Sequence, residues 1–296
     1  MPRNLDSTAR EWRTFLTQTG RVERVSQLIA SSLRLPDAAE GQQFLSVRLA
    51  RFVDGFGLHR LDALIEDGET AHLRSIVGVQ HSWFWREPEQ FTFLISHLEG
   101  KLARGEPIRI WSAATSSGQE AYSIAIALLE AAAPRRPRAD ILATDLDALA
   151  LRVARVGRYS EAHVAHLPPS LRQWLLHRES DANAPWQVRP EVSNLVSFRS
   201  LDLLSDDWRT ASDALQTSGP ETPFAAIFCR NVLMYFGAAY RFAILEGLAA
   251  RLGPGGLLCL GQSENIGNAS QFFEPCGRGM YLRRAAFPHA AKVSSP

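Results

Sequence analysis

The segment Phe224-Ala-Ala-Ile-Phe-Cys-Arg-Asn-Val-Leu-Met-Tyr-Phe236 constrains the fold more than any other part of the chain. Its residues 225–229 form an uninterrupted apolar run, which is typical of a parallel strand buried on both faces. Arg230 and Asn231 stand where that strand ends, and Tyr235 follows four residues later. Ligands of open α/β sheets bind outside the carboxyl ends of the strands, so these side chains are candidates for binding a substrate or cofactor. The alternative is a strand end with a satisfied arginine and an asparagine cap.

Short apolar runs alternate with helical runs through the C-terminal two thirds of the chain. Strands are predicted at residues 108–114, 140–144, 225–229, 257–260 and 279–283, and helices at 119–133, 146–155 and 240–252. The sequence Gly253-Pro-Gly-Gly256 is expected to stop the last of these helices. Alternation of this kind predicts an α/β fold, with a parallel sheet and helices on both of its faces.

The remaining regions suggest how the chain is divided. Residues 1–75 are predicted to form an all-α N-terminal domain, because apolar positions recur at helical spacing. Residues 76–95 are predicted to be a linker and helix start that contributes Arg86, and 96–287 the main domain. Strand-like pieces within about 178–198 predict a small β subdomain inserted in the main domain, and 288–296 read as a disordered tail.

Charge and cysteine content exclude several function classes. The 32 basic and 31 acidic side chains give a net charge of +1, so no global electrostatic case exists for binding nucleic acid or an anionic membrane. The three cysteines lack the spacing of a zinc site or a disulfide framework, and no metal is expected. No apolar run reaches transmembrane length and the first residues lack a signal-peptide core, so we expect a cytoplasmic protein without membrane insertion. Nothing demands more than a monomer.

Three arginines in the N-terminal region leave two interpretations open. Arg48 and Arg51 are spaced to share one helix face, and Arg60 is close in sequence. Such a group is either a solvated helix face or a docking surface for an acidic protein partner.

The loop after the first predicted strand is small and polar, and its Gly118 permits close approach of the backbone. It has neither the GxGxxG pattern nor a Walker lysine, so it is a poor cradle for phosphates. The carboxylate of Glu120 in this loop suits a ligand that carries positive charge. A carboxylate at the end of the second strand, where Asp145 stands, commonly binds ribose hydroxyls. Together they favour a nucleoside that carries positive charge. S-adenosylmethionine fits that description. The alternatives are a capping box of Ser117 with Glu120 and a helix N-cap at Asp145.

Five segments resemble, in order and spacing, motifs of the CheR family, the protein-glutamate O-methyltransferases of bacterial chemotaxis. They are Ser82-Trp-Phe-Trp-Arg-Glu-Pro88, Trp111-Ser-Ala-Ala-Thr-Ser-Ser-Gly-Gln-Glu-Ala-Tyr-Ser-Ile-Ala125, Ala143-Thr-Asp-Leu-Asp147, Ile227-Phe-Cys-Arg-Asn-Val-Leu-Met-Tyr-Phe236 and Gly261-Gln-Ser-Glu-Asn265. The resemblance implies a Rossmann-like methyltransferase sheet with a β subdomain and an all-α N-terminal domain. It implies methyl transfer from S-adenosylmethionine to glutamates of chemoreceptor cytoplasmic domains, with S-adenosylhomocysteine as product.

The resemblance also implies the site residues. Arg86 and Tyr235 would lie nearest to the transferring methyl group. Cofactor contacts would fall on Gln80, Ser82, Arg86, Glu120, Asp145, Asp202, Leu203, Arg230 and Asn231. Gln80, Ser82 and Asp202 stand where the family often has Asn, Thr and Asn, and Asp202 adds negative charge near the adenosine. The alternatives are a regulatory or docking module that binds S-adenosylmethionine with little catalysis, and a methyltransferase of this fold with another acceptor.

Overall fold

The structure is a computed structural model that describes residues 5–33, 49–50, 52–53, 57–68, 82–176, 184–204 and 222–285. The chain divides into a smaller compact unit, Met1–Val79 with Tyr235–Ala238, and a larger one, Gln80–Met234 with Ala239–Pro296. The predictions for Gln80, Arg48, Arg51 and the tail 288–296 lie outside the described residues and stay predictions.

The smaller unit is helical over its described residues, as the sequence predicts. Its helices are α1 (Leu5–Gln18), α2 (Arg21–Leu33) and α4 (Leu58–Glu66). Leu16, Val25 and Leu61 are fully buried in one apolar cluster that joins these helices. Arg21 donates to Asp62 at 2.7 and 3.0 Å, and this pairing lowers the pKa of the aspartate. Arg60, near the start of α4, is exposed.

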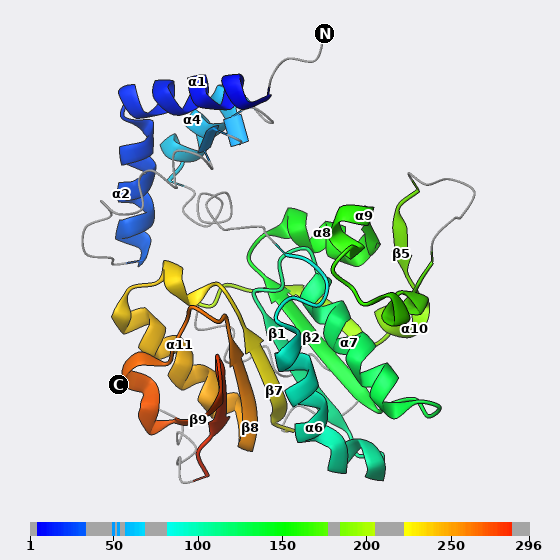
Figure 1. Ribbon diagram of the computed structural model, residues 1–296. Coiled ribbons are helices and arrows are strands. Elements are labelled where there is room, and N and C mark those ends of the chain that lie inside the picture. Colours follow the sequence, from blue (N-terminus) through cyan, green and yellow to red (C-terminus); the bar gives the residue numbers. More distant parts are fainter. Residues whose placement is uncertain are drawn as a thin grey trace. The chain divides into compact units, whose positions relative to one another are not determined.

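The larger unit is built on a seven-stranded sheet with the order β6-β2-β1-β7-β8-β10-β9 (Figure 1). The strands are β1 (Ile108–Ala113), β2 (Ala139–Asp145), β6 (Val196–Ser200), β7 (Phe224–Cys229), β8 (Leu252–Leu260), β9 (Phe273–Gly277) and β10 (Met280–Arg283). The first five strands in the sheet order are parallel, and β10 runs antiparallel to both of its neighbours. The α/β prediction is therefore confirmed.

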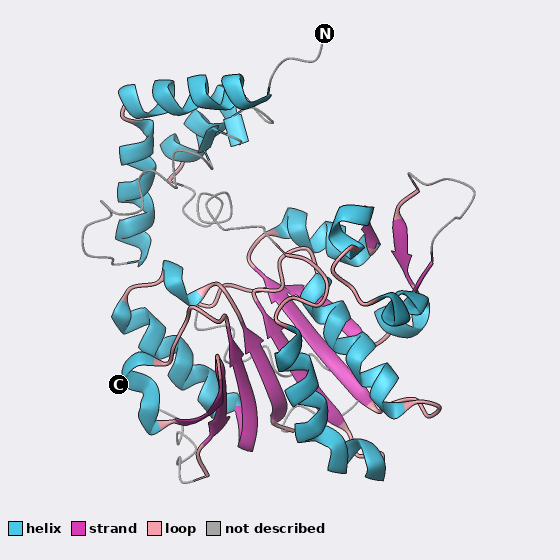
Figure 2. Ribbon diagram, viewed as in Figure 1, coloured by secondary structure: helices cyan, strands magenta, loops and turns pink. Residues whose placement is uncertain are grey.

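Helices cover the sheet on both faces (Figure 2). The main ones are α6 (Pro88–Arg104), α7 (Gln119–Ala132), α8 (Ala148–Val156) and α11 (Ala238–Arg251). The chain steps from β1 to β2 in one direction and from β7 to β8 in the other, so right-handed crossovers put α7 and α11 on opposite faces. The reversal of order between β1 and β7 marks the point where ligands of such sheets bind.

The strands at the centre of the sheet are buried on both faces, and their sequences are mostly apolar, although β1 also contains the buried Arg109 and Ser112. Every residue of β1 is buried, and so are all residues of β7 except Ala225. Cys229 and Cys259 are fully buried in neighbouring strands, and burial raises the pKa of both thiols well above the usual value. Both cysteines are therefore core residues.

The β subdomain differs from the prediction. The structure has a three-stranded sheet of β3 (Arg158–Tyr159), β5 (Trp186–Val188) and β4 (Leu175–Leu176). The strand-like piece near residues 195–198 belongs instead to β6, which pairs with β2 in the main sheet. Two strands of the subdomain, β3 and β4, therefore lie before residue 178, and the last predicted piece is not part of the subdomain. The short helices α9 (Glu161–Val164) and α10 (Pro190–Ser193) and the 3₁₀ helix Pro169–Trp174 accompany it.

The C-terminal end of the sheet holds two further differences. Residues 253–256 do follow the end of α11, but they lie inside β8, whose register against β7 shifts between Phe224 and Ala226. The edge strand β9 was not predicted, because it contains Pro275 and shows little apolar periodicity.

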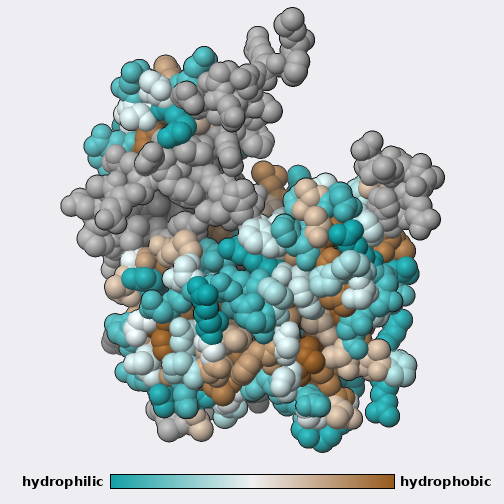
Figure 3. All heavy atoms as spheres, in the orientation of Figure 1, coloured by the Kyte–Doolittle hydropathy of each residue, from teal (hydrophilic) through white to brown (hydrophobic). Residues whose placement is uncertain are grey.

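None of the described helices is long and apolar enough to cross a membrane. On the face shown in Figure 3, hydrophilic and hydrophobic residues are interspersed over the larger unit.

Candidate functional site

The polar residues singled out in the sequence gather at the carboxyl edge of the sheet. The strand register sets Ala113 beside Thr144, Ser112 beside Phe228, and Cys229 beside Leu260. The loops that follow β1, β2, β7 and β8 therefore leave the sheet at the same edge. A fifth segment, residues 82–87, joins them because Arg230 donates from Nη1 to the carbonyl oxygen of Arg86 at 2.7 Å.

The backbone of these segments is strained. Among the described residues, the non-glycine residues with positive φ all lie in them: Trp85, Glu87, Ala114, Ser116 and Asn231. Each such residue costs on the order of 1–3 kcal/mol, and strain of this kind clusters at ligand-binding and catalytic sites. The edge is therefore the functional-site candidate on geometric grounds as well.

A buried ion pair lies at the centre of this edge. Glu120 Oε2 accepts from Arg230 Nε at 2.6 Å, and Glu120 Oε1 accepts from Ser112 Oγ at 2.6 Å. The side chains of Arg230 and Glu120 are only 3% and 9% exposed. Burial lowers the pKa of Arg230, but the nearby carboxylates of Glu120 and Glu87 more than offset this and raise it.

These contacts decide two of the alternatives left open by the sequence. The capping box is wrong, because α7 starts after Gly118 without any side-chain cap and Glu120 turns inward to Arg230. The alternative of a satisfied arginine describes Arg230 well, since Gln90 Oε1 also accepts from its Nη1 at 3.3 Å. Gln90 is fully buried and donates to the carbonyl of Leu260 at 2.8 Å, a role that no sequence pattern indicated.

Asp145 links the loops after β1 and β2. Its Oδ2 accepts from the backbone N–H of Ser116 at 2.7 Å and its Oδ1 from that of Asp147 at 2.8 Å. Burial raises the pKa of Asp145, and the backbone donors partly oppose this effect. The N-cap alternative is wrong, because Asp147 caps α8 by accepting from Leu149 and Ala150. The Asp145 carboxylate instead lies at the strand end where a ligand is expected.

The loop after β1 offers polar atoms without protein partners. Thr115 Oγ1, Ser116 Oγ and Gln119 Nε2 are buried and make no hydrogen bond. The loop itself is fixed, since Tyr159 donates from its hydroxyl to the carbonyl of Ser117 at 2.6 Å. Buried polar groups are normally satisfied, so unpaired donors and acceptors beside Asp145 fit a ligand rich in hydroxyl and amine groups, as a nucleoside is.

The other predicted cofactor residues occupy different parts of this edge. The turn after β6 lies next to Asp145, because the N–H of Leu201 donates to the Asp145 carbonyl at 3.0 Å. In that turn Asp202 Oδ1 accepts from the N–H of Leu204 at 2.9 Å, and Leu203 is buried. Ser82 is half-buried at the start of the segment that leads to α6.

Arg86 is half-buried in the same segment. Its guanidinium carbon lies 4.6 Å from the centre of the Trp83 ring, and its Nε is 3.9 Å from Glu87 Oε1. Burial lowers the pKa of Arg86, and the charge of Glu87 counteracts part of this. Stacking and the nearby carboxylate fix where this cation can point.

Glu264 is a site residue that the sequence analysis missed. Its Oε2 accepts from the N–H groups of Asn231 at 2.6 Å and Gly261 at 2.8 Å, and its Oε1 from that of Met234 at 3.3 Å. A Cβ at Gly261 would lie 2.4 Å from Asn231 Nδ2, so any larger residue there has to displace the Asn231 side chain. The signal was the motif that contains Glu264, to which no role was given.

The carboxylate of Glu264 thus holds the loop that leads into Tyr235. Tyr235 is the last residue of the 3₁₀ helix Leu233–Tyr235, and its side chain lies outside what the structure describes. The structure brings together the segments of Arg86, Glu120, Arg230 and Asn231, and it joins Asp145 to the turn of Asp202.

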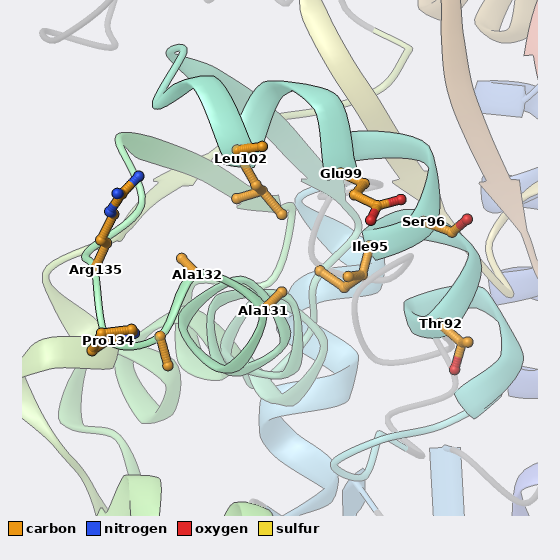
Figure 4. Close-up of a pocket in the computed structure, with 11 residues that line it drawn as sticks. Thr92, Ile95, Ser96, Glu99, Leu102, Ala131, Ala132, Pro134 and Arg135 are labelled. Carbon is orange, nitrogen blue, oxygen red and sulfur yellow. The ribbon is translucent and has the colours of Figure 1, made fainter.

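A groove of about 740 Å³ lies elsewhere, between α6 and the end of α7 (Figure 4). Its walls include Ile95, Leu102 and Pro134. Because α7 starts at the carboxyl edge, residues at its far end lie toward the opposite edge of the sheet, and the groove is separate from the site above. In the described ranges, no cluster of three or more His, Cys, Asp or Glu side chains is arranged to hold a metal ion.

Comparison with known proteins shows which family the chain resembles. Residues 80–281 match the family described as "CheR methyltransferase, SAM binding domain". The chain is similar to chemotaxis protein methyltransferase 2 of Pseudomonas aeruginosa, with 34% identity over 267 residues that cover 90% of this chain and 88% of that protein. It is also similar to the chemotaxis protein methyltransferase of Escherichia coli, with 30% identity over 266 residues that cover 87% of this chain and 88% of that protein.

Proposed function

We propose, since this chain belongs to the CheR family of methyltransferases, that it methylates glutamate side chains of chemoreceptor cytoplasmic domains and forms glutamate methyl esters. The chain is a methyltransferase of chemotaxis that uses S-adenosylmethionine. The observation that carries the proposal is the Glu120–Arg230 pair, which ties the segment of Arg86 to the loop that starts α7.

The polar atoms of the edge support a set of cofactor contacts. Asp145 and the unpaired Ser116 Oγ beside it suit ribose hydroxyls and an amine, and the unpaired Gln119 Nε2 at the start of α7 offers a further donor. The side chains of Arg230 and Glu120 are committed to each other, so their contribution would be to position the loop backbone. The full proposed set is Gln80, Ser82, Arg86, Glu120, Asp145, Asp202, Leu203, Arg230 and Asn231.

The chemistry places few demands on acid–base groups. A glutamate side chain has a pKa of about 4.3 and is ionised at neutral pH, so it is a nucleophile without a general base. When bound, S-adenosylmethionine supplies a methyl group on a cationic sulfur and leaves as neutral S-adenosylhomocysteine. Because opposite charges are neutralised as the reaction proceeds, the protein accelerates it by excluding water and by orienting the carboxylate.

Arg86 and Tyr235 are the residues proposed to orient the reactants. An arginine that gripped the carboxylate equally in the ground state and the transition state would add binding without rate, so its proposed role is positioning. We expect Arg86→Ala and Tyr235→Phe each to lower turnover about tenfold or more, because misoriented reactants lose effective concentration. Initial rates with labelled S-adenosylmethionine test this. Arg86→Lys is the control that keeps the charge but loses the planar fork.

The outcome that contradicts these two roles is turnover at the wild-type rate in both variants, with unchanged circular dichroism. A loss in Arg86→Ala that Arg86→Lys restores would assign the effect to charge. A loss in both arginine variants would assign it to the geometry of the guanidinium.

The raised pKa of Asp145 leads to a pH-dependent prediction. If its carboxylate accepts from the ribose, cofactor affinity is present above the raised pKa and is lost as pH falls through it. The loss should begin at a higher pH than for an ordinary aspartate. Asp145→Asn should weaken binding about tenfold or more and remove this pH dependence.

Calorimetric titration with S-adenosylmethionine over a pH series measures both effects. Asp147→Asn is the matched control, because Asp147 caps α8 and asparagine is an equally good cap. An unchanged pH profile in Asp145→Asn would remove Asp145 from the cofactor site.

Transfer to a receptor cytoplasmic fragment tests the proposed function directly. The chain is incubated with labelled S-adenosylmethionine and the fragment, and the product is treated with base. Methyl esters release labelled methanol, whereas N-methyl groups do not. Stable label would indicate another acceptor, and cofactor binding without transfer to several fragments would indicate a regulatory module.

A further inference from the structure

Helix α8 carries an apolar stripe that faces solvent. Leu149, Val153 and Val156 are 57%, 46% and 57% exposed, and they are half of the six large apolar side chains exposed among the described residues. Their spacing of four and three residues sets them on one face of the helix. The opposite face, with Ala150, Leu151 and Ala154, is buried in the larger unit. The three side chains of the stripe therefore do not contribute to the packing of α8 against the larger unit.

The same helix is basic. Arg152 and Arg155 are exposed on α8, which contains no acidic residue, and Arg158 lies two residues after its end. At about 100° per residue, Arg152 lies beside Leu149 and Val156 along one border of the stripe. Arg155 donates to the carbonyl oxygen of Phe198 at 3.0 Å, and this neutral acceptor does not cancel the positive charge of the arginine. The surface thus combines an apolar centre with a positively charged border.

The position of α8 connects this surface to the active-site edge. Its N-cap, Asp147, follows two residues after Asp145 and donates its backbone N–H to the Asp145 carboxylate at 2.8 Å. The helix has nine residues and is about 14 Å long, at about 1.5 Å per residue. A partner segment that lies along α8 would therefore extend to the loops that surround the proposed cofactor site (Figure 1).

We propose that the α8 surface, defined as Leu149, Arg152, Val153 and Val156, docks an acidic amphipathic helix of the protein substrate. This inference rests on the proposed function, in which the partner presents glutamate side chains. The apolar stripe matches the apolar face of such a helix, and Arg152 matches its carboxylates. Nucleic acid would pair with Arg152 but leave the apolar stripe exposed, so the charge and the apolar side chains together favour the acidic amphipathic helix.

Two variants test the surface separately for charge and apolarity. Arg152→Glu reverses the charge, and Val153→Ser with Val156→Ser removes the apolar contact without touching the core. We expect each to raise KM for a receptor cytoplasmic fragment about fivefold or more, with kcat within about twofold and the Kd for S-adenosylmethionine unchanged. Arg136→Glu is the matched control, because Arg136 is exposed in the loop after α7, away from α8.

Direct binding of the fragment separates the outcomes. If the wild type methylates the fragment and KM stays within twofold in both variants, the α8 surface is not the docking site. If the wild type binds the fragment through α8 but transfers no methyl group, the proposed function fails and the surface stands. If Arg136→Glu raises KM as much as Arg152→Glu, the effect is net charge alone and the proposal is wrong.

Discussion

Replacing Arg230 with methionine is expected to lower the free energy of unfolding by about 3–5 kcal/mol, the range for breaking a buried pair. The substitution leaves the Glu120 carboxylate without its cation in a site where that side chain is 9% exposed. It also takes the Nη1 donor from the carbonyl of Arg86, whose bond is 2.7 Å long. Urea denaturation, followed by fluorescence and circular dichroism, measures the change.

Two variants show whether the cost comes from the orphaned charge. Adding Glu120→Gln to Arg230→Met should restore part of the stability, because no ionised group then stays buried without a partner. Arg284→Met is the exposed control, since Arg284 pairs with Glu274 at 3.7 Å with side chains 46% and 65% exposed. Such pairs contribute about 0–1 kcal/mol. If Arg230→Met costs no more than Arg284→Met, the pair does not organise the site.

The parts of the fold that the sequence predicted well are those whose local pattern is sufficient. β1 and β7 are buried on both faces because helices cover both sides of the sheet, and their mostly apolar runs identify them without knowledge of any partner. The pieces near 186 and 195 look alike in sequence, but one joins the small sheet and the other pairs with β2. Strand partners are set by contacts distant in sequence, which a local pattern does not encode.

For the candidate site too, the sequence predicted what depends on local pattern and missed what depends on contacts distant in sequence. The rule for α/β sheets was enough to expect Asp145 and Arg230 at one edge. It did not reveal what each side chain does there, because Glu120 and Arg230 meet across 110 positions of sequence. Glu264 escaped notice for the same reason, since its partners are the backbone N–H groups of another loop, which any sequence would supply.

Replacing Glu264 with glutamine is expected to lower turnover about tenfold to a hundredfold. A glutamine whose one oxygen keeps the bonds to Asn231 and Gly261 turns its NH2 donor toward the N–H of Met234, which now donates to Glu264 Oε1 at 3.3 Å. The substitution also removes the negative charge from the two bonds that remain. Hydrogen bonds to a charged group contribute about 1.5–3 kcal/mol each, and about 1.4 kcal/mol corresponds to tenfold in rate. Steady-state kinetics with a receptor fragment and calorimetric titration with the cofactor measure the effect.

The role argued for Glu264 is positioning, so its effect should differ from that of a residue touching the reactants. One loop carries both Asn231, proposed to contact the cofactor, and Tyr235, proposed to orient the acceptor. Glu264→Gln should therefore raise the cofactor Kd and lower kcat together, whereas Tyr235→Phe should lower kcat alone. Gly261→Ala should reproduce the double effect, because its Cβ would displace Asn231. Glu274→Gln, an exposed control, should change neither quantity. A Glu264→Gln enzyme with wild-type Kd and kcat would mean that the loop keeps its shape without this carboxylate.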